Sequence, residues 1–347
     1  MARLMPHMLF DVLIFLAGVA VASLALRDVF ETVVVPGGNR GSLRVAHRII
    51  YILLPVWKAV RGRRRGVSGT FAPIVLVLSF IVWMSLLAVG FGLMFHAARY
   101  GFRPVEHSVA EAIYQAGGTI LTLGLNEAQA VGIGRWIVLA AGFCGLAVMT
   151  MAVTYLLAVQ TSLAQRDTGI IKLGTSAGDP PAALTLLENL ALIDDRQELA
   201  DILREGRNWC AMVRQSHSAH PSLIYFQTSG TGAGWSAALG ALIDLALITE
   251  YCLDERPLRG PAVLLGAEAT RLAGQICAVI HLPPGNCESP VADVEQLGAR
   301  LAAAGYAIRA DFDAAALAQR RGKLHATVEA LAAHLGKPSS PLLPASA

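Results

Sequence analysis

The residues with the most distinctive chemistry lie in a short stretch between two long apolar segments. Its apolar part runs from Ala112 to Leu125, which is too short to cross about 30 Å of hydrocarbon as a helix at 1.5 Å per residue. Non-helical backbone at that depth is tolerated only where protein or water satisfies its polar groups, so we expect a re-entrant loop. A short helix entering the membrane points its carbonyl end at the centre, where its partial negative charge favours a cation.

The start of this short helix is marked by Ser108, with Glu111 three residues later. That spacing is the capping box, in which the two side chains satisfy the free N–H groups of the first turn. We therefore predict a helix from Ser108 to about Gly117, followed by the segment that carries the chemistry.

After the predicted helix, residues 119–127 read Thr-Ile-Leu-Thr-Leu-Gly-Leu-Asn-Glu, which resembles the potassium-channel pore signature TxTTVGYGD. The resemblance implies that four copies converge and that backbone carbonyls, with the Thr122 hydroxyl, replace the hydration shell of a potassium ion. Gly124 suits such a segment because glycine adopts positive φ without penalty. The resemblance assigns the pore mouth to Glu127 and ion binding to a predicted filter segment of Thr122, Leu123, Gly124, Leu125 and Asn126.

Three positions depart from the common signature. Asn126 stands in place of the second glycine, which asparagine replaces best because it tolerates left-handed dihedrals. Leu125 stands in place of the tyrosine or phenylalanine that braces the filter from behind, and Glu127 in place of aspartate. A potassium-selective pore and a weakly selective cation pore therefore both remain open.

Two segments without any charged residue flank the loop, residues 71–98 and 136–165, and each is long enough to span a bilayer. A weaker third span, residues 8–26, includes Asp11 and lacks a cleavage site, so we predict a retained membrane helix. Gly142 and Gly145 follow the filter at the distance where channels of this class bend their pore-lining helix. They predict a gating hinge, although glycine is also common in membrane helices.

The distribution of basic residues predicts the orientation. Residues 27–68 contain nine Lys and Arg, whereas residues 98–131 contain two, and basic loops stay in the cytoplasm. This places the N-terminus outside a bacterial inner membrane and everything after Lys172 inside. The run from Arg61 to Arg65 abuts a membrane helix, which favours contact with anionic lipid over nucleic acid.

The pattern of the second half of the chain predicts a cytoplasmic bundle of about five helices, with prolines at the joints between them. Asp179, followed by two prolines, is expected to cap the first of them. The composition, 54% hydrophobic and 15% charged, agrees with an all-α membrane protein. The predicted domains are an N-terminal membrane helix with a basic interfacial linker (1–67), a potassium-channel-like pore domain (68–175), the bundle (176–335) and a disordered tail (336–347).

Two other signals are weighed against this interpretation. Residues 223–240 imitate a strand, a glycine-rich turn and a helix, with Asp254 further on, as in a dinucleotide-binding site. However, the following residues read as Ala- and Leu-rich helices. His217 and His220 have the spacing of two metal ligands but lack a cysteine or carboxylate partner.

No grouping of side chains supports an enzyme, and no cofactor is expected besides permeant potassium ions. The wider chain also resembles a group of poorly characterised bacterial channel proteins, in DVFETVVVP (residues 28–36), in the filter, and in HPSLIYFQ and WSAALGALIDLA of the second half. The resemblance implies a homotetrameric cation channel that binds no nucleic acid. The alternative is a non-conducting membrane-anchored sensor or scaffold with a nucleotide-binding cytosolic domain.

Overall fold

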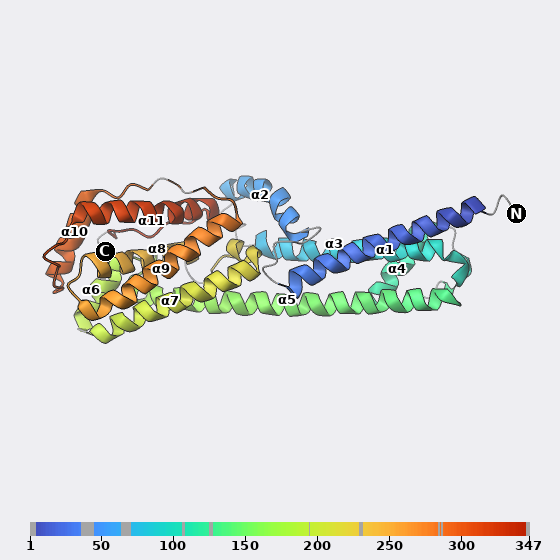
Figure 1. Ribbon diagram of the computed structural model, residues 1–347, viewed down its shortest axis with the longest axis horizontal. Helices are drawn as coiled ribbons and strands as arrows, with labels where there is room; N and C mark the ends of the chain where they lie inside the picture. The colour runs from blue at the N-terminus through green and yellow to red at the C-terminus, as the bar shows by residue number, and fades with distance from the viewer. Residues whose placement is uncertain are drawn as a thin grey trace. The chain divides into compact units, whose positions relative to one another are not determined.

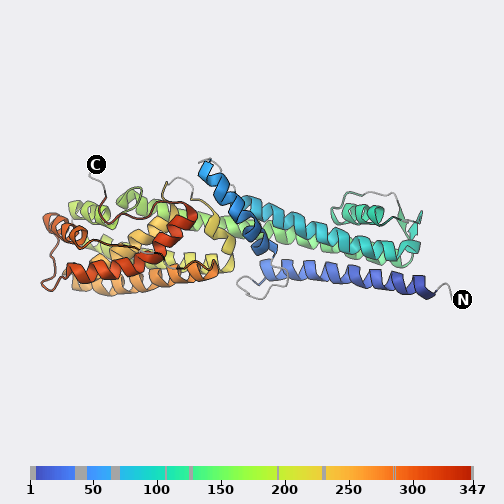
Figure 2. The same ribbon diagram turned by 90° about the horizontal axis from the view of Figure 1, so that it is seen from above.

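The computed structural model describes residues 5–35, 45–63, 71–105, 108–124, 128–193, 195–228, 232–283, 285 and 287–344. Within these residues the fold is helical apart from one ladder of two short strands and an isolated bridge (Figures 1 and 2). The chain divides into two compact units, Met1–Val159 and Gln160–Ala347. The predicted boundary after residue 175 falls inside one long helix, whose last turns belong to the second unit.

The first unit contains the long apolar helices and the short helix expected between them. Its elements are α1 (Met5–Val33), α2 (Val45–Arg63), α3 (Phe71–Ala97), η1 (Arg99–Gly101), β1 (Phe102–Arg103), α4 (Val109–Ile120), β2 (Gln129–Ala130) and the greater part of α5 (Ile133–Ala177).

The helices of the first unit carry apolar side chains on their outer faces as well as between them. Leu13 of α1, Ile81 of α3 and Phe143 of α5 are all exposed, while α1 packs along α3. Apolar residues outside and small residues between helices are the pattern of helices that face lipid, because lipid offers no hydrophobic drive for burial.

Four helices of the described residues are long and apolar enough to cross a membrane: α1, α3, α5 and α9 (Arg256–Val279). The first three were expected. The fourth packs against α7 (Arg196–Ala219) and α8 (Gly234–Tyr251) in the second unit, and its Glu268 accepts a hydrogen bond of 2.6 Å from Arg214 of α7. α9 is therefore amphipathic enough to serve as a bundle helix.

The second unit is a helical bundle built around α8. Every residue of α8 from Gly234 to Thr249 is buried, as expected of a helix that is apolar almost all round. Counting α8, the described residues form six α-helices after α5 instead of about five, because the sequence analysis did not identify α10 (Val291–Ala303) after the proline-rich joint. The remaining elements are α6 (Ala183–Ile193), η2 (Pro221–Tyr225), α10 (Val291–Ala303) and α11 (Ala314–Leu335).

One carboxylate interrupts the apolar surface of α8. Asp244 is 1% exposed and accepts two hydrogen bonds from Arg321 of α11, at 2.8 and 3.0 Å. The Nε2 atom of His325, one turn later on α11, lies 2.8 Å from Asp244 Oδ1. The charge is therefore buried with both of its partners on one neighbouring helix, which fixes the register of α8 against α11.

Two predictions for this unit are wrong. Asp179 does not cap the helix that follows it, since α6 begins at Ala183. Its carboxylate instead accepts from the backbone N–H groups of Gly232 and Ala233, at 2.8 and 3.2 Å, where α8 begins. The sequence places Asp179 beside prolines, but only the fold brings it to the unsatisfied N–H groups of a distant helix.

The tail after Gly336 was predicted to be disordered, and this is wrong for residues 337–344. Ser340 and Leu342 are buried, and Lys337 Nζ donates to Gly232 O at 3.1 Å. The tail packs on α8 where Gly240 leaves room, since a Cβ there would lie 3.0 Å from Ser340 Cβ.

Candidate functional site

The short helix α4 begins where the sequence predicted but for a different reason. Ser108 occupies the N-cap position with an extended backbone, yet its side chain makes no capping hydrogen bond, so the predicted capping box is wrong. The helix is fixed by burial of one face instead, since Ala112, Ala116 and Ile120 are all fully buried.

This buried face of α4 is held closely by α3 and α5. A Cβ on Gly92 of α3 would lie 2.5 Å from Ile113 Cγ1, and a Cβ on Gly145 of α5 would lie 2.3 Å from the Ile120 carbonyl oxygen. Glycine at both positions lets the helix backbones approach. With only 12 residues, α4 is too short to cross a bilayer, and the chain turns back into α5.

The end of α4 is a Schellman motif. Leu123 N–H donates to Gly118 O at 2.8 Å, and Thr122 N–H donates to Thr119 O at 3.1 Å. In this motif the residue directly after the C-cap takes a left-handed conformation and is usually glycine. Here it is Thr122, with φ of 55°, and Gly124 follows with φ of 67°. A β-branched residue in this conformation is an outlier that marks a constrained segment.

The part of the filter segment that the structure describes is exposed and has free acceptors. Thr122, Leu123 and Gly124 are all exposed, and within the described residues no backbone N–H donates to their carbonyl oxygens. Leu125 and Asn126, with Glu127 at the predicted pore mouth, lie outside the described residues. The described half thus presents three carbonyl oxygens that are open to an external partner such as water or a cation.

The two ends of the loop are tied together beyond the filter segment. β1 and β2 pair antiparallel, with Phe102 opposite Ala130 and Arg103 opposite Gln129. Closer to the filter, the buried side chain of Gln115 in α4 donates from Nε2 to Ala128 O at 3.0 Å. The Gln115 amide therefore braces the segment that follows the filter, a role that the sequence analysis missed although a lone amide in an apolar stretch was its signal.

Replacing Gln115 by leucine is expected to disturb the loop without unfolding α4. The change keeps the side-chain size but leaves the Ala128 carbonyl without its donor, at a cost of about 1–3 kcal/mol. We expect lower or less selective flux in reconstituted liposomes. Gln129→Leu is the matched control, because Gln129 is exposed. Equal losses in both variants would contradict the bracing role.

The two glycines predicted to form a hinge differ in their surroundings. α5 runs as one continuous helix through both. Gly145 is the close-approach point against Ile120, whereas a Cβ on Gly142 would meet only Thr119 Cγ2, at 4.0 Å. Gly145 therefore has a packing reason to be glycine, and the gating hinge stays a prediction.

Two carboxylates of α1 have partners that the sequence did not reveal. Asp28 is buried and accepts from Trp83 Nε1 of α3 at 2.8 Å and from Val45 N–H of α2 at 3.3 Å. Asp11 accepts two hydrogen bonds from the Arg99 guanidinium at 2.6 and 2.9 Å. These contacts join α1 to α2, α3 and η1 within the first unit.

The basic run predicted to contact lipid is described only in part. Arg61 and Arg63 belong to the last turn of α2, and Arg64 and Arg65 lie outside the described residues. The contact with anionic lipid therefore stays a prediction.

The rival nucleotide signal loses its structural basis. Residues 221–225 form the 3₁₀ helix η2 instead of a strand, so the strand, turn and helix of a dinucleotide-binding site are not assembled there. His217 and His220 are both buried, and no group of three or more candidate metal ligands occurs within the described residues.

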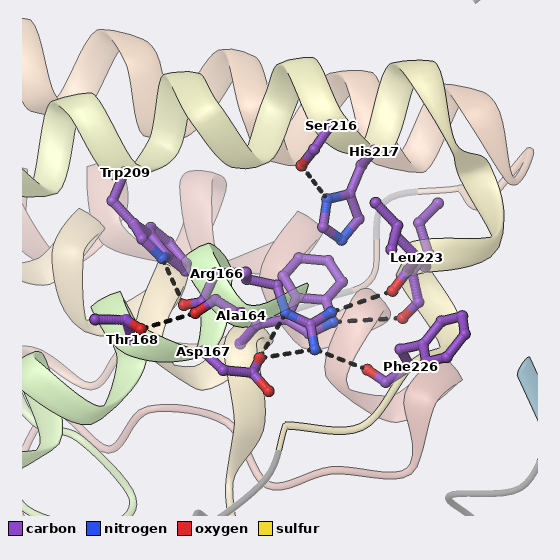
Figure 3. Close-up of polar contacts among 11 residues, drawn as sticks. Ala164, Arg166, Asp167, Thr168, Trp209, Ser216, His217, Leu223 and Phe226 are labelled. Carbon is purple, nitrogen blue, oxygen red and sulfur yellow. Dashed lines mark hydrogen bonds and ion pairs between the residues drawn. The ribbon is translucent and has the colours of Figure 1, made fainter. Parts of the chain in front are cut away.

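Within the second unit, a buried arginine bonds the last turns of α5 to neighbouring elements. Arg166 is fully buried, and its guanidinium donates to the carbonyl oxygens of Leu223 and Phe226, at 3.1 and 3.2 Å. It also forms an ion pair with Asp167 at 3.0 Å. Its own carbonyl oxygen accepts from Trp209 Nε1 at 2.9 Å (Figure 3). α5 is thereby bonded to both α7 and η2.

Comparison with known proteins adds one similarity. No family model matches the chain, and no solved structure matches it. Over 212 residues, 58% of this chain, the sequence is 21% identical to the uncharacterized membrane protein YdjJ of Bacillus subtilis (strain 168). The chain is a membrane protein whose described residues are largely helical. The match spans 60% of the length of YdjJ, and the printed name of that protein states no activity.

Proposed function

We propose that this membrane protein is a subunit of a homotetrameric cation channel, with residues 108–126 as its pore loop. The observation that carries the proposal is the end of α4, where exposed Thr122, Leu123 and Gly124 present carbonyl oxygens without a donor among the described residues. A helix buried between two apolar helices directs these groups to one place, and a dehydrated cation satisfies them.

A single chain cannot enclose an ion with this segment. Tyr114 of α4 and Leu123, which follows α4, are 55% and 62% exposed, while Ala112, Ala116 and Ile120 of α4 are fully buried. We infer that these side chains and the carbonyl groups beside them contact further copies, because cyclic symmetry brings identical loops around one axis. The resemblance to the potassium-channel signature sets the number of copies at four.

We place the protein in a bacterial inner membrane, with α1, α3 and α5 as its spans, the N-terminus outside and the second unit in the cytoplasm. The nine basic residues between residues 27 and 68 support this orientation. In this arrangement α2 lies in the headgroup region, and the arginines at 61–65 contact anionic lipid.

Potassium is the proposed permeant ion because of the sequence Thr-Leu-Gly before Leu125. A weakly selective cation pore is the second candidate, favoured by Leu125 and Asn126, which lack the bracing ring and the second glycine of the common signature. A non-conducting sensor or scaffold predicts no flux under any condition.

Thallium flux into proteoliposomes tests the proposal. We expect flux from the native protein and its loss in Gly124→Pro, because proline cannot adopt the positive φ at this position. Gly260→Ala is the control, since Gly260 has open space around it in the second unit. Absence of flux from well-folded native protein would refute a channel, and equal sodium and potassium permeability would replace the selective version by the weakly selective one.

A further inference from the structure

The second unit contains a cavity of about 650 Å³ that the proposed channel function does not use. The last turns of α5 form one wall and α7 forms the other, while Leu186 of α6 and Leu242 of α8 lie at its base. Its volume is in the range of small-molecule sites. We propose that this cavity binds an organic cation, an ammonium group carried on an apolar body, as a regulatory ligand.

The base of the cavity suits the apolar body of such a ligand. Leu186, Ala238 and Leu242 line it together with Trp209 of α7. The Trp209 indole packs directly on α5, since a Cβ on Gly169 would lie 2.1 Å from its Cδ1 atom. Its Nε1 group is engaged by the Arg166 carbonyl oxygen (Figure 3), which fixes the ring, and an aromatic face also attracts ammonium groups.

The charges that line the cavity favour a cation. Its acidic residues outnumber its basic ones, with Glu198, Asp201 and Glu205 against Lys172 and Arg204. Both basic side chains are already paired, Lys172 with Glu205 at 3.5 Å and Arg204 with Asp201 at 2.6 Å. Glu198 is exposed and, within the described residues, its carboxylate has no hydrogen-bond or ion-pair partner, so it is the carboxylate that is open to an ammonium group.

The helix ends around the cavity reinforce this preference. Leu173, Thr175 and Ser176 belong to the end of α5, where backbone carbonyl groups carry a partial negative charge. The start of α7 would offset this with free N–H groups, but the side chain of Asp195 accepts from Gln197 N–H and Glu198 N–H at 2.9 and 3.0 Å. These two N–H groups are therefore already satisfied and are not available to an anionic ligand.

Occupancy of the cavity affects α5 directly. The cavity lies between α5 and α7, which are joined by the hydrogen bond from Trp209 Nε1 to the Arg166 carbonyl oxygen. α5 continues without a break from Ile133 to Ala177. A cation that contacts both walls stabilises one separation of these helices over another. The inference goes beyond the proposed channel function, and its test measures binding without ion flux.

Fluorine NMR on the full chain in nanodiscs, with its five tryptophans replaced by 5-fluorotryptophan, tests the site. Trp209→Phe assigns the Trp209 resonance. We expect phenylethylammonium to shift this resonance saturably, at concentrations about tenfold lower than its neutral analogue phenylethanol, which corresponds to about 1.4 kcal/mol. Glu198→Gln should remove most of that tenfold difference.

Two further variants make the result decisive. Glu295→Gln removes the same charge from the exposed surface of α10 and should leave binding unchanged. Lys172→Met frees the Glu205 carboxylate and should tighten binding of phenylethylammonium. The proposal is overturned if the neutral analogue binds equally well, if the Trp209 resonance does not respond to the amine, or if Glu198→Gln and Glu295→Gln behave alike.

Discussion

Replacing Gly145 by alanine is expected to cause a large loss of ion flux. The added methyl group would lie 2.3 Å from the Ile120 carbonyl oxygen, and a backbone atom cannot move aside as a side chain does. Overpacking of this kind costs about 1–3 kcal/mol, which shifts the equilibrium between packed and displaced α4 by about 5–150-fold. Thallium flux in proteoliposomes measures the loss.

Gly142→Ala is the matched control, because it makes the same substitution one turn earlier on α5. A Cβ there meets only Thr119 Cγ2 at 4.0 Å, so flux should stay near the native level. If both variants lost flux equally, a hinge role for both glycines would explain the result better than the close approach at Gly145. If neither lost flux, the packing of α4 on α5 would not matter for conduction.

Replacing Asp244 by asparagine is expected to destabilise the second unit by about 3–5 kcal/mol, because it leaves buried Arg321 without its charged partner. Arg321 is 7% exposed and His325 is fully buried, so water cannot replace the carboxylate. Hydrogen exchange of α8 and α11 peptides in the full chain should show the loss of protection. Asp201→Asn removes an exposed ion pair with Arg204 and should cost less than about 1 kcal/mol.

The Asp244 carboxylate also makes the stability of the bundle fall at acidic pH. Burial raises the pKa of Asp244, but the positive charges of His325 and Arg321 and their hydrogen bonds lower it further, so its pKa lies below the ordinary 3.8. A lowered pKa contributes stability above pH 3.8 that is lost as pH falls below that value. Native protein should therefore lose protection in α8 below about pH 4, and Asp244→Asn should lack this step.

The sequence was sufficient where local pattern decides the structure. Charge-free stretches located α3 and α5, and the short apolar run after Ser108 located α4, because length and hydropathy are properties of the chain itself. Tertiary partners were not accessible in this way. Asp179 caps α8 instead of α6, Asp28 bonds to Trp83, and Arg166 is buried in the second unit, since each depends on residues far away in sequence.

The candidate site was predicted in position but not in its supports. Thr122 and Gly124 were identified from the resemblance, and the structure adds their positive φ angles and the Schellman motif. Gln115 is a lone amide in an apolar stretch, but its partner is the backbone carbonyl of Ala128, which the sequence does not identify. Leu125, Asn126 and Glu127 lie outside the described residues, and their contribution to selectivity stays a prediction.

The central claim is that several copies of the loop around Thr122 and Gly124 surround one ion pathway. Electron microscopy of detergent-purified particles tests it most directly, through the symmetry of averaged views along the membrane normal. The account predicts fourfold symmetry with one pore loop from each subunit at the axis. Monomeric particles, or particles with the loops turned away from the axis, would contradict it.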